Sequence, residues 1–446
     1  MPVINVAKHC KNVLKYLNGT GAFYIKGADT SIHPDSDSEL RFYQDSNMLY
    51  ISGVAEPGFS FVYDINNHKS ILFAPYISPD EAVWIGSQPS HDEIKQTYGV
   101  DQVHSMTDFE TVIKSINPQT LYRIDYQSDA QVSALNLNIN SESLLKAIHE
   151  ARIYKEPEEI AILQKASDIS SRAHALLMKN NYVGQNECNV HADFVGSIMN
   201  QGSNREAYTT IVGRGRNAST LHYIRNDSPI EDPTDLVLVD AGASYKGYSA
   251  DITRTWPAGK TFTKEAKEIY QIVLDMQTAV LDASKPHVQW EDMHMLAMKV
   301  AAQGLLKLGI LKGSLDEVMD SYIVGYFFPH GLGHFLGIDT HDCAGYPEGV
   351  PRINKPSIRY LRVRREMLPG MVFTVEPGLY FVHDLIEEAR NTPELAKYVD
   401  FDVVQKYFKV GGVRIEDNIV ITEDGILNLT TAPKTVEDLE KIKNSE

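Results

Sequence analysis

Carboxylate side chains stand at the ends of apolar, β-branched runs in the second half of the chain. Leu236–Val239 predicts a buried strand that ends in Asp240, and Asp251 follows a turn beyond it. If a hairpin closes near Tyr245 and Lys246, Asp240 and Asp251 face each other across its ladder. Like charges placed opposite each other destabilise a sheet, so we expect a shared proton or a bound divalent cation between them.

A glycine-rich stretch further along the chain carries three histidines. Its sequence is F-P-H-G-L-G-H-F-L-G-I-D-T-H-D, with His330, His334 and His341. A lone histidine is usually a satisfied core residue, but glycine lets the backbone approach a site closely. Three histidines on such a stretch therefore indicate a functional site.

Two later strands each carry a charge into an apolar environment. The run T-V-E-P-G places Glu376 before a Pro-Gly turn, and R-I-E-D-N sets Arg414 and Glu416 on one face of a strand. Each carboxylate taken alone could be a salt bridge or a strand-end cap. Taken together, the candidate metal ligands are Asp240, Asp251, His334, Glu376 and Glu416.

Four carboxylates buried together need positive charge, and two divalent metal ions would supply it. Oxygen-rich ligation with one imidazole favours Mn²⁺ over a structural zinc site, although Co²⁺ or Zn²⁺ would also fit the ligand set. Two metals about 3.5–4 Å apart can share a water, turn it into a nucleophile near neutral pH and polarise a carbonyl. This ligand set therefore points to hydrolysis.

Two α/β domains (α+β in type) are expected to position these residues, one over residues 1–155 and one over residues 156–446. The boundary is predicted where Pro157 and its acidic neighbours open a new helix. In the first domain the patterns predict helices at 3–18, 79–85, 107–116 and 141–154 and strands at 21–26, 47–53, 59–64, 70–74 and 121–126. In the second they predict helices at 158–180, 187–200, 263–283 and 290–308 and strands at 209–213, 235–240, 249–256, 371–381 and 413–422. The stretches 29–39 and 352–359 match no pattern, and the latter lies in a short basic cluster.

Charge and composition restrict the partners. The 446-residue chain has a net charge of −17, which argues against nucleic acid and anionic membranes. No apolar run reaches the length of a membrane span, and the N-terminal residues lack the apolar core of a signal peptide. Three dispersed cysteines suit a reducing compartment, so a cytoplasmic location is expected.

The motifs resemble those of the pita-bread metallopeptidases. The resemblance is carried by D-A-G-A-x-Y-x-G-Y-x-A-D-I-T-R-T, H-G-L-G-H-x-L-G-I-D-x-H-D, T-V-E-P-G-L-Y-F and R-I-E-D-N, over the C-terminal two thirds of the chain. Residues 41–58 resemble the creatinase-like N-terminal domain of the same group. Within the group the motifs are most similar to prolidase, the Xaa-Pro dipeptidase, which lies close to the Xaa-Pro aminopeptidases. The resemblance implies a creatinase-like N-terminal domain followed by a pita-bread catalytic domain, and a homodimer paired through the N-terminal domain.

The resemblance also implies residue roles. It assigns the two metals to the same five residues and implies that a metal-bridging hydroxide attacks the carbonyl before proline, with Glu376 as the proton shuttle. His341 would steady the tetrahedral intermediate, and His222 would belong to the substrate pocket. Arg362, fourteen residues before Glu376, would hold the free carboxylate of a dipeptide, and Arg414 would lie near the substrate.

Alternatives to a dipeptidase remain. The nearest is an Xaa-Pro aminopeptidase that acts on longer peptides with the same metal site. A non-catalytic pita-bread binding protein is more remote, because all five candidate ligands are present. A creatinase-type carbon–nitrogen hydrolase would leave the four carboxylates unexplained.

Overall fold

The computed structural model describes residues 4–127 and 129–445. The chain divides into two compact units, Met1–Tyr154 and Lys155–Glu446. Among the described residues, no helix combines the length and apolar character needed to cross a lipid bilayer.

The N-terminal unit is built on a mixed six-stranded sheet with the strand order β4-β3-β2-β1-β5-β6. The two central pairs, β1 with β2 and β2 with β3, are antiparallel, whereas the outer pairs are parallel. Its strands are β1 (Ala22–Lys26), β2 (Ser60–Asp64), β3 (Lys69–Ala74), β4 (Gln102–Ser105), β5 (Leu121–Arg123) and β6 (Ile139–Asn140).

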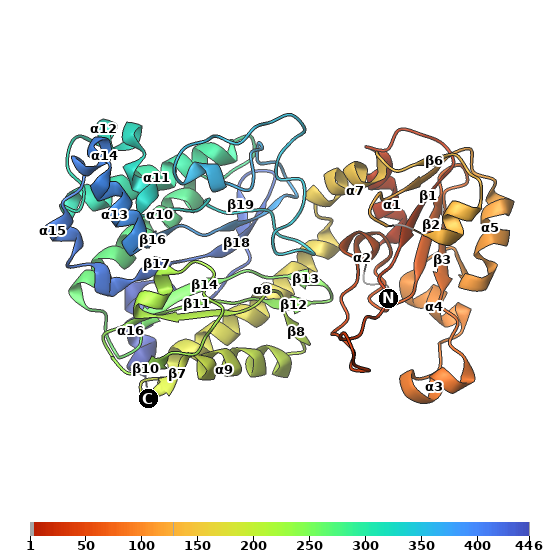
Figure 1. Ribbon diagram of the computed structural model, residues 1–446, viewed down its shortest axis with the longest axis horizontal. Coiled ribbons are helices and arrows are strands. Elements are labelled where there is room, and N and C mark those ends of the chain that lie inside the picture. The colour runs from red at the N-terminus through yellow and green to blue at the C-terminus, as the bar shows by residue number, and fades with distance from the viewer. Residues whose placement is uncertain (1–3, 128, 446) are drawn as a thin grey trace. The chain divides into compact units, whose positions relative to one another are not determined.

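Helices cover both faces of this sheet. They are α1 (Val6–Leu14), α2 (Ser46–Ser52), α3 (Pro79–Ile85), α4 (His91–Tyr98), α5 (Phe109–Ile116), α6 (Ala130–Ala134) and α7 (Leu144–Ile153). Figure 1 shows α5 on one side of the strands and α1, α2 and α7 on the other. Tyr24 and Phe73 point toward α5 and meet Phe109, while the neighbouring Phe23 packs on Phe61 on the same sheet. The alternation of side chains along each strand thus builds a core on each face.

One predicted element of this unit is wrong. The apolar run at 47–53 was expected as a strand but forms the helix α2. The Asp45 side chain accepts the backbone N–H groups of Asn47 and Met48, and Gly53 ends the helix with a φ of 72°. Every residue from Asn47 to Ser52 is buried, so the run carries no polar face from which a helical period could be read.

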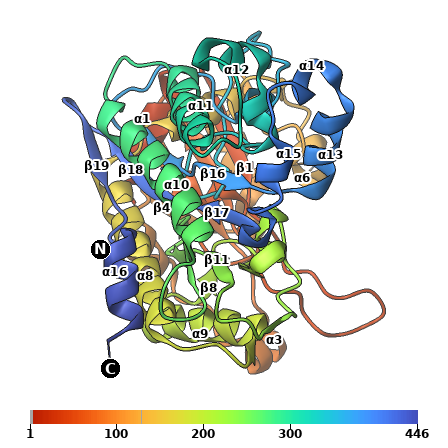
Figure 2. The ribbon, with the colours of Figure 1, turned by 90° about the vertical axis from the view of Figure 1, so that its left-hand side faces the viewer.

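The C-terminal unit repeats one arrangement of two helices followed by a hairpin. The first copy has α8 (Pro157–Lys179), α9 (Glu187–Asn200) and the strands β11 (Leu236–Asp240), β12 (Ala243–Tyr245), β13 (Tyr248–Ser249) and β14 (Thr253–Pro257). The second has α10 (Lys264–Ala283), α11 (Trp290–Lys307) and the strands β15 (Val372–Val375), β16 (Gly378–Tyr380), β17 (Gly412–Arg414) and β18 (Asp417–Ile421). Helix α8 packs against β12 and β13, and α10 packs against β15, β16 and β17. Figures 1 and 2 show the two helix pairs on separate sides of the strands.

Smaller elements complete this unit. Three short strands extend the hairpins, namely β8 (Arg205–Glu206), β9 (Ile211–Arg214) and β19 (Ile426–Asn428). The strands β7 (Gln185–Asn186) and β10 (Pro229–Ile230) pair with each other in a separate two-stranded sheet. The remaining helices are α12 (Leu315–Ser321), α13 (His383–Asn391), α14 (Pro393–Ala396), α15 (Phe401–Val404) and α16 (Val436–Lys443). Helix α16 returns to pack against both α8 and α10, so the last helix joins the two copies.

Each hairpin is interrupted between an outer and an inner strand pair. In the first, β11 pairs with β14 and β12 pairs with β13, with the tip at Lys246 and Gly247. In the second, β15 pairs with β18 and β16 pairs with β17. The predicted hairpin tip is therefore correct, but the predicted register is not. Asp240 pairs with Thr253, and Asp251 lies in the interruption rather than opposite Asp240.

Candidate metal centre and substrate cavity

Three of the predicted ligands form a compact buried group. One ligand atom from each of Asp251, His334 and Glu416 lies within 4.8 Å of the other two. The Asp251 Oδ2 to His334 Nε2 distance is 3.3 Å. The three residues come from the first hairpin, the histidine-rich loop and the second hairpin, so the fold itself brings them together.

Asp240 joins this group through a tyrosine that the sequence did not point to. The Tyr208 hydroxyl lies 2.6 Å from Asp240 Oδ1 and 2.6 Å from Asp251 Oδ1. A hydroxyl has a single proton and can donate to one of these carboxylates only. The other contact is stable when that carboxylate is itself protonated or is bound to a cation.

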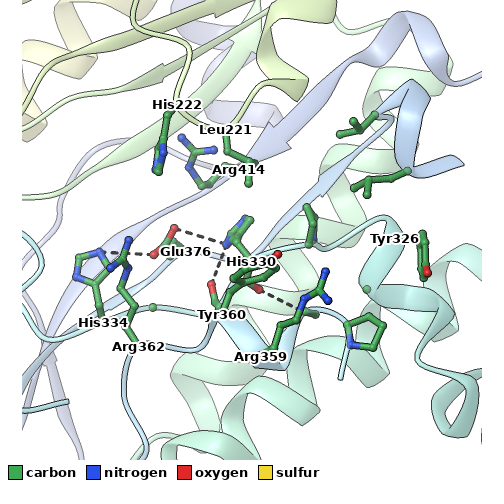
Figure 3. Close-up of a pocket in the computed structure, with 18 of the residues that line it drawn as sticks. Leu221, His222, Tyr326, His330, His334, Arg359, Tyr360, Arg362, Glu376 and Arg414 are labelled. Carbon is green, nitrogen blue, oxygen red and sulfur yellow. Dashed lines mark hydrogen bonds and ion pairs between the residues drawn. The ribbon is translucent and has the colours of Figure 1, made fainter. Parts of the chain in front are cut away.

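Glu376 closes the other side of the group. Its Oε1 lies 3.6 Å from His334 Nε2, and its Oε2 lies 3.8 Å from His330 Nδ1, as the dashed lines in Figure 3 show. His330 Nε2 is 2.9 Å from the Tyr380 hydroxyl, which also accepts a hydrogen bond from Arg414 Nη1 at 2.9 Å. Arg414 Nη2 in turn donates to Asp240 Oδ2 at 2.7 Å. Hydrogen bonds thus link Asp240 to His330 through Arg414 and Tyr380, and His330 lies in a longer contact with Glu376.

The electrostatics of the cluster indicate missing positive charge. Burial raises the pKa of Glu416, and the neighbouring Asp251 and Glu376 carboxylates raise it further. Burial likewise raises the pKa of Asp240 and of Glu376. Burial would also raise the pKa of Asp251, but contact with His334 outweighs it and holds that pKa below its usual range. Carboxylates brought together in this way are stable when protons or cations neutralise them.

The residues present fit divalent cations. Glu416 Oε1 is buried and has no hydrogen-bond partner among the described residues, as expected of an atom reserved for a metal. Carboxylate oxygens with one imidazole suit Mn²⁺ and similar ions. Bound divalent cations would lower the pKa of a coordinated water and polarise a peptide carbonyl.

The predicted substrate residues line the cavity above this cluster. His341 packs edge-on to His334 with ring centroids 4.5 Å apart, and Figure 3 shows His222 and Arg362 pointing toward Glu376. Burial lowers the pKa of His341 to about 3, and the nearby His334 and Arg362 lower it as well. Arg362 is exposed and forms no hydrogen bond or ion pair with any described residue. Its guanidinium is therefore available to a ligand.

Comparisons with known proteins agree with this geometry. Residues 161–423 match metallopeptidase family M24, and residues 6–122 match the aminopeptidase P N-terminal domain. The chain belongs to metallopeptidase family M24. A probable Xaa-Pro aminopeptidase of Coccidioides posadasii is 41% identical over 98% of this chain and 96% of its own length. One of Aspergillus niger is 42% identical over 94% of this chain and 92% of its own length.

Solved structures show the same relationship. Aminopeptidase PepP of Pseudomonas aeruginosa superposes with a TM-score of 0.84 at 28% identity, covering 99% of this chain and 98% of its own. Escherichia coli aminopeptidase P with the inhibitor Pro-Leu gives the same TM-score and coverage at 30% identity. The predicted fold class, an N-terminal domain followed by a pita-bread domain, is confirmed. The prediction of a metallopeptidase is confirmed too, but the relatives carry the name of the aminopeptidase alternative and not that of prolidase.

This M24 metallopeptidase also contains supporting residues that sequence reasoning missed. Lys155 Nζ and Asp342 Oδ2 form an ion pair of 2.9 Å with both side chains 2% exposed, directly beside His341. Arg254 is completely buried and donates to the backbone carbonyl of Glu416. The sequence offered no signal for these contacts, because the partners lie more than 150 residues apart.

Proposed function

We propose that this M24 metallopeptidase is an Xaa-Pro aminopeptidase, which releases the first residue of a peptide whose second residue is proline. The observation that carries the proposal is the extent of the cavity, which has a total volume of about 900 Å³ and continues beyond the carboxylate cluster. It continues past Arg362 to Tyr326, Arg359 and Leu385, which leaves room for residues after the proline. The E. coli relative bound to Pro-Leu, a peptide that continues beyond proline, supports the same conclusion.

Two divalent metal ions, with Mn²⁺ as the expected metal, are proposed to bind among the five predicted ligands. Support comes from the converging carboxylates and the unpartnered Glu416 Oε1. Glu376 is proposed to move the proton from the attacking water to the departing amine. Glu376 lies 3.6 Å from His334 and also lines the cavity that a substrate would enter, a position that suits this transfer.

The remaining predicted residues are proposed to hold the substrate. His341 is neutral because of its lowered pKa, so one ring N–H can donate to the oxygen on which charge develops. Arg414 is fixed by Asp240 and Tyr380, and it can direct the scissile region without moving. His222 is exposed at the cavity wall, where it can contact the backbone of the substrate.

A second candidate function is the Xaa-Pro dipeptidase. The observation that favours it is the unpaired Arg362 guanidinium, which lies beside His341 and could form two hydrogen bonds with the terminal carboxylate of proline. In a longer peptide the same guanidinium would meet a backbone carbonyl. The two functions therefore differ in whether a free carboxylate is needed at Arg362.

The decisive assay compares hydrolysis of Gly-Pro and Gly-Pro-Ala by metal-stripped protein with and without Mn²⁺. The aminopeptidase proposal requires cleavage of the tripeptide, restored by the metal. Arg362→Met should lower kcat/KM for Gly-Pro by about 100-fold if Arg362 binds the carboxylate, and by much less for Gly-Pro-Ala. Lys355→Met, from the same basic stretch but with its side chain over Tyr322, is the control. Cleavage of Gly-Pro alone would replace the proposal with the dipeptidase.

A homodimer through the N-terminal unit is proposed on the exposure of α3. Val83, Trp84 and Ile85 are 79%, 87% and 65% exposed, and among the described residues of this helix none is buried. Large apolar side chains in such a row are typical of a protein interface. Light scattering should give a dimer mass for the native chain and a monomer mass for Trp84→Glu. A monomeric native chain would refute the proposal.

The cytoplasmic location stays a prediction.

A further inference from the structure

The part of the cavity farthest from the carboxylate cluster has its own set of side chains. We call it the outer lobe, and its lining residues are Tyr326, Arg359, Tyr360, Val382, Leu385 and Glu388. Figure 3 shows Tyr326 and Arg359 across the cavity from His334 and His222. Arg359 belongs to the stretch at 352–359 that matched no sequence pattern. A peptide cleaved at the cluster would direct its residues after proline toward this lobe.

The segment Pro356–Arg362 that carries Arg359 is held by tight backbone packing. A Cβ atom on Gly331 would lie 2.8 Å from Leu361 Cα, and one on Gly345 would lie 2.1 Å from the Arg362 carbonyl oxygen. Only glycine fits at such approaches. The segment is therefore fixed against neighbouring backbone, and this packing sets the backbone positions of Arg359 and Arg362.

A strained, buried serine anchors the same segment. Ser357 has a φ of 67° and a ψ of −71°, outside the regions that a residue with a side chain prefers. Its hydroxyl lies 3.1 Å from His294 Nε2 and 3.1 Å from the His330 carbonyl oxygen. Strain of this kind persists where the surroundings hold the backbone, and it concentrates at functional sites.

The guanidinium of Arg359 has a charge that no described carboxylate neutralises. Arg352 Nη1 donates to the Arg359 carbonyl at 3.1 Å, so Arg352 supports the backbone. The Arg359 guanidinium lies over the Tyr360 ring, 4.8 Å from its centroid, and forms no ion pair with a described carboxylate. Glu388 on the lobe accepts a hydrogen bond from the Tyr326 hydroxyl at 3.1 Å. The lobe thus presents one guanidinium that has no ion-pair partner among the described residues and one carboxylate that is already hydrogen-bonded.

We infer that Arg359 is a specificity-determining residue that selects negative charge on the residue after proline. The inference rests on the proposed aminopeptidase function and extends it to a substrate class, peptides of the form Xaa-Pro-Glu or Xaa-Pro-Asp. Arg362 lies nearer the cluster and meets the backbone, whereas Arg359 meets the next side chain. Glu388 opposes this preference because its own charge repels an acidic residue in the same lobe.

The test compares Gly-Pro-Glu-amide with Gly-Pro-Gln-amide in the Mn²⁺-loaded protein. The two peptides have the same size, and both lack a terminal carboxylate, so they differ only in side-chain charge. Because the ion pair is solvent-exposed, the expected preference for the Glu peptide is about 3- to 5-fold in kcat/KM. Added salt should reduce the preference.

Three variants assign the preference to its source. Arg359→Gln should reduce the ratio to about one, and Glu388→Gln should raise it, because the two charges act in opposite directions. Lys355→Gln removes the same charge from the same stretch, but Lys355 is not among the cavity-lining residues. It should leave the ratio unchanged.

Equal rates for the two peptides in the native chain, or a ratio that survives Arg359→Gln, would overturn the inference. Cleavage of both amides without a preference would leave the proposed function standing. Cleavage of neither amide would refute the proposed function. The ratio of their dissociation constants for the Mn²⁺-loaded protein would then decide the inference, since tighter binding of the Glu peptide supports it and equal binding overturns it.

Discussion

Replacing Arg254 by lysine should destabilise the C-terminal unit without removing a charge. The Arg254 guanidinium is completely buried on β14, and all five of its N–H groups donate hydrogen bonds. The acceptors are one Asp417 carboxylate oxygen and the carbonyls of Thr253, Glu416, Ala432 and Pro433, at distances of 2.6–3.0 Å. Lysine has three donors, so at least two of these bonds must be lost. The Thr253 carbonyl would keep its bond from the Glu416 N–H, so at least one buried acceptor is left without a partner.

The cost follows from the acceptors left unpaired. Each buried acceptor without a partner costs about 1–3 kcal/mol, so the loss of one or two partners in Arg254→Lys should lower the free energy of unfolding by about 1–6 kcal/mol. Because Arg254 holds the backbone of Glu416, the affinity for Mn²⁺ should fall by about 10-fold as well.

Urea unfolding followed by tryptophan fluorescence suits this measurement. Two of the three tryptophans, Trp256 and Trp290, are buried in the C-terminal unit. Arg225→Lys is the matched control, since Arg225 is exposed and pairs with Asp227 at the surface. It should change stability by less than about 0.5 kcal/mol. A loss below about 1 kcal/mol for Arg254→Lys would refute the hydrogen-bond argument.

Three further predictions concern burial, pH and metal. Lys155→Met removes the ammonium partner of the buried Asp342 carboxylate and should lower the free energy of unfolding in urea by about 3–5 kcal/mol. The double variant Lys155→Met/Asp342→Leu should recover much of that loss, and additive losses would contradict the ion pair. Burial lowers the pKa of His294 to about 3, against about 6.5 when unfolded, so the unfolded chain alone takes up a proton as the pH falls below 6.5. Between pH 6 and 4 the free energy of unfolding of the native chain should therefore fall by about 1.4 kcal/mol per pH unit relative to that of His294→Gln. If the free energies of the two proteins change with pH in parallel, His294 is not buried in its neutral form. Removal of divalent cations by a chelator should abolish hydrolysis and lower the melting temperature, and Mn²⁺ in excess should restore both; an unchanged melting temperature would argue against the proposed metal centre.

Much of the candidate site could be predicted because its residues carry a local signal. Asp240, Glu376 and Glu416 each end or interrupt an apolar β run, and a charge at that place in a strand is conspicuous without any knowledge of tertiary contacts. The structure brings these residues together with Asp251 and His334, which the charge argument required. Their roles in metal binding and catalysis stay proposals until variants are assayed.

The residues that sequence reasoning missed act through distant partners. Tyr208 joins two carboxylates 32 and 43 positions away, and Arg254 reaches carbonyls more than 160 positions away. Neither residue lies in a pattern that differs from an ordinary buried tyrosine or arginine. The error over α2 has a different origin, because complete burial removed the periodicity on which the helix prediction depends.

The two interrupted hairpins explain why this fold can assemble so many carboxylates. Asp240 ends β11, Asp251 lies between β13 and β14, and Glu376 and Glu416 lie in the two breaks of the second hairpin. At a break the backbone leaves the ladder, so a side chain can turn toward the facing hairpin instead of alternating across the sheet.

Hydrogen bonds also connect the interruption of the first hairpin to that of the second. The Glu416 N–H donates to the Thr253 carbonyl at 3.0 Å, and the Thr253 hydroxyl donates to Glu416 Oε2 at 2.7 Å. The first hairpin thus positions Glu416 of the second, and Arg414 of the second hairpin holds Asp240 of the first. Since the carboxylates repel one another without a cation, metal binding and the packing of the two hairpins should be thermodynamically linked, and the chelated protein should open first at these breaks.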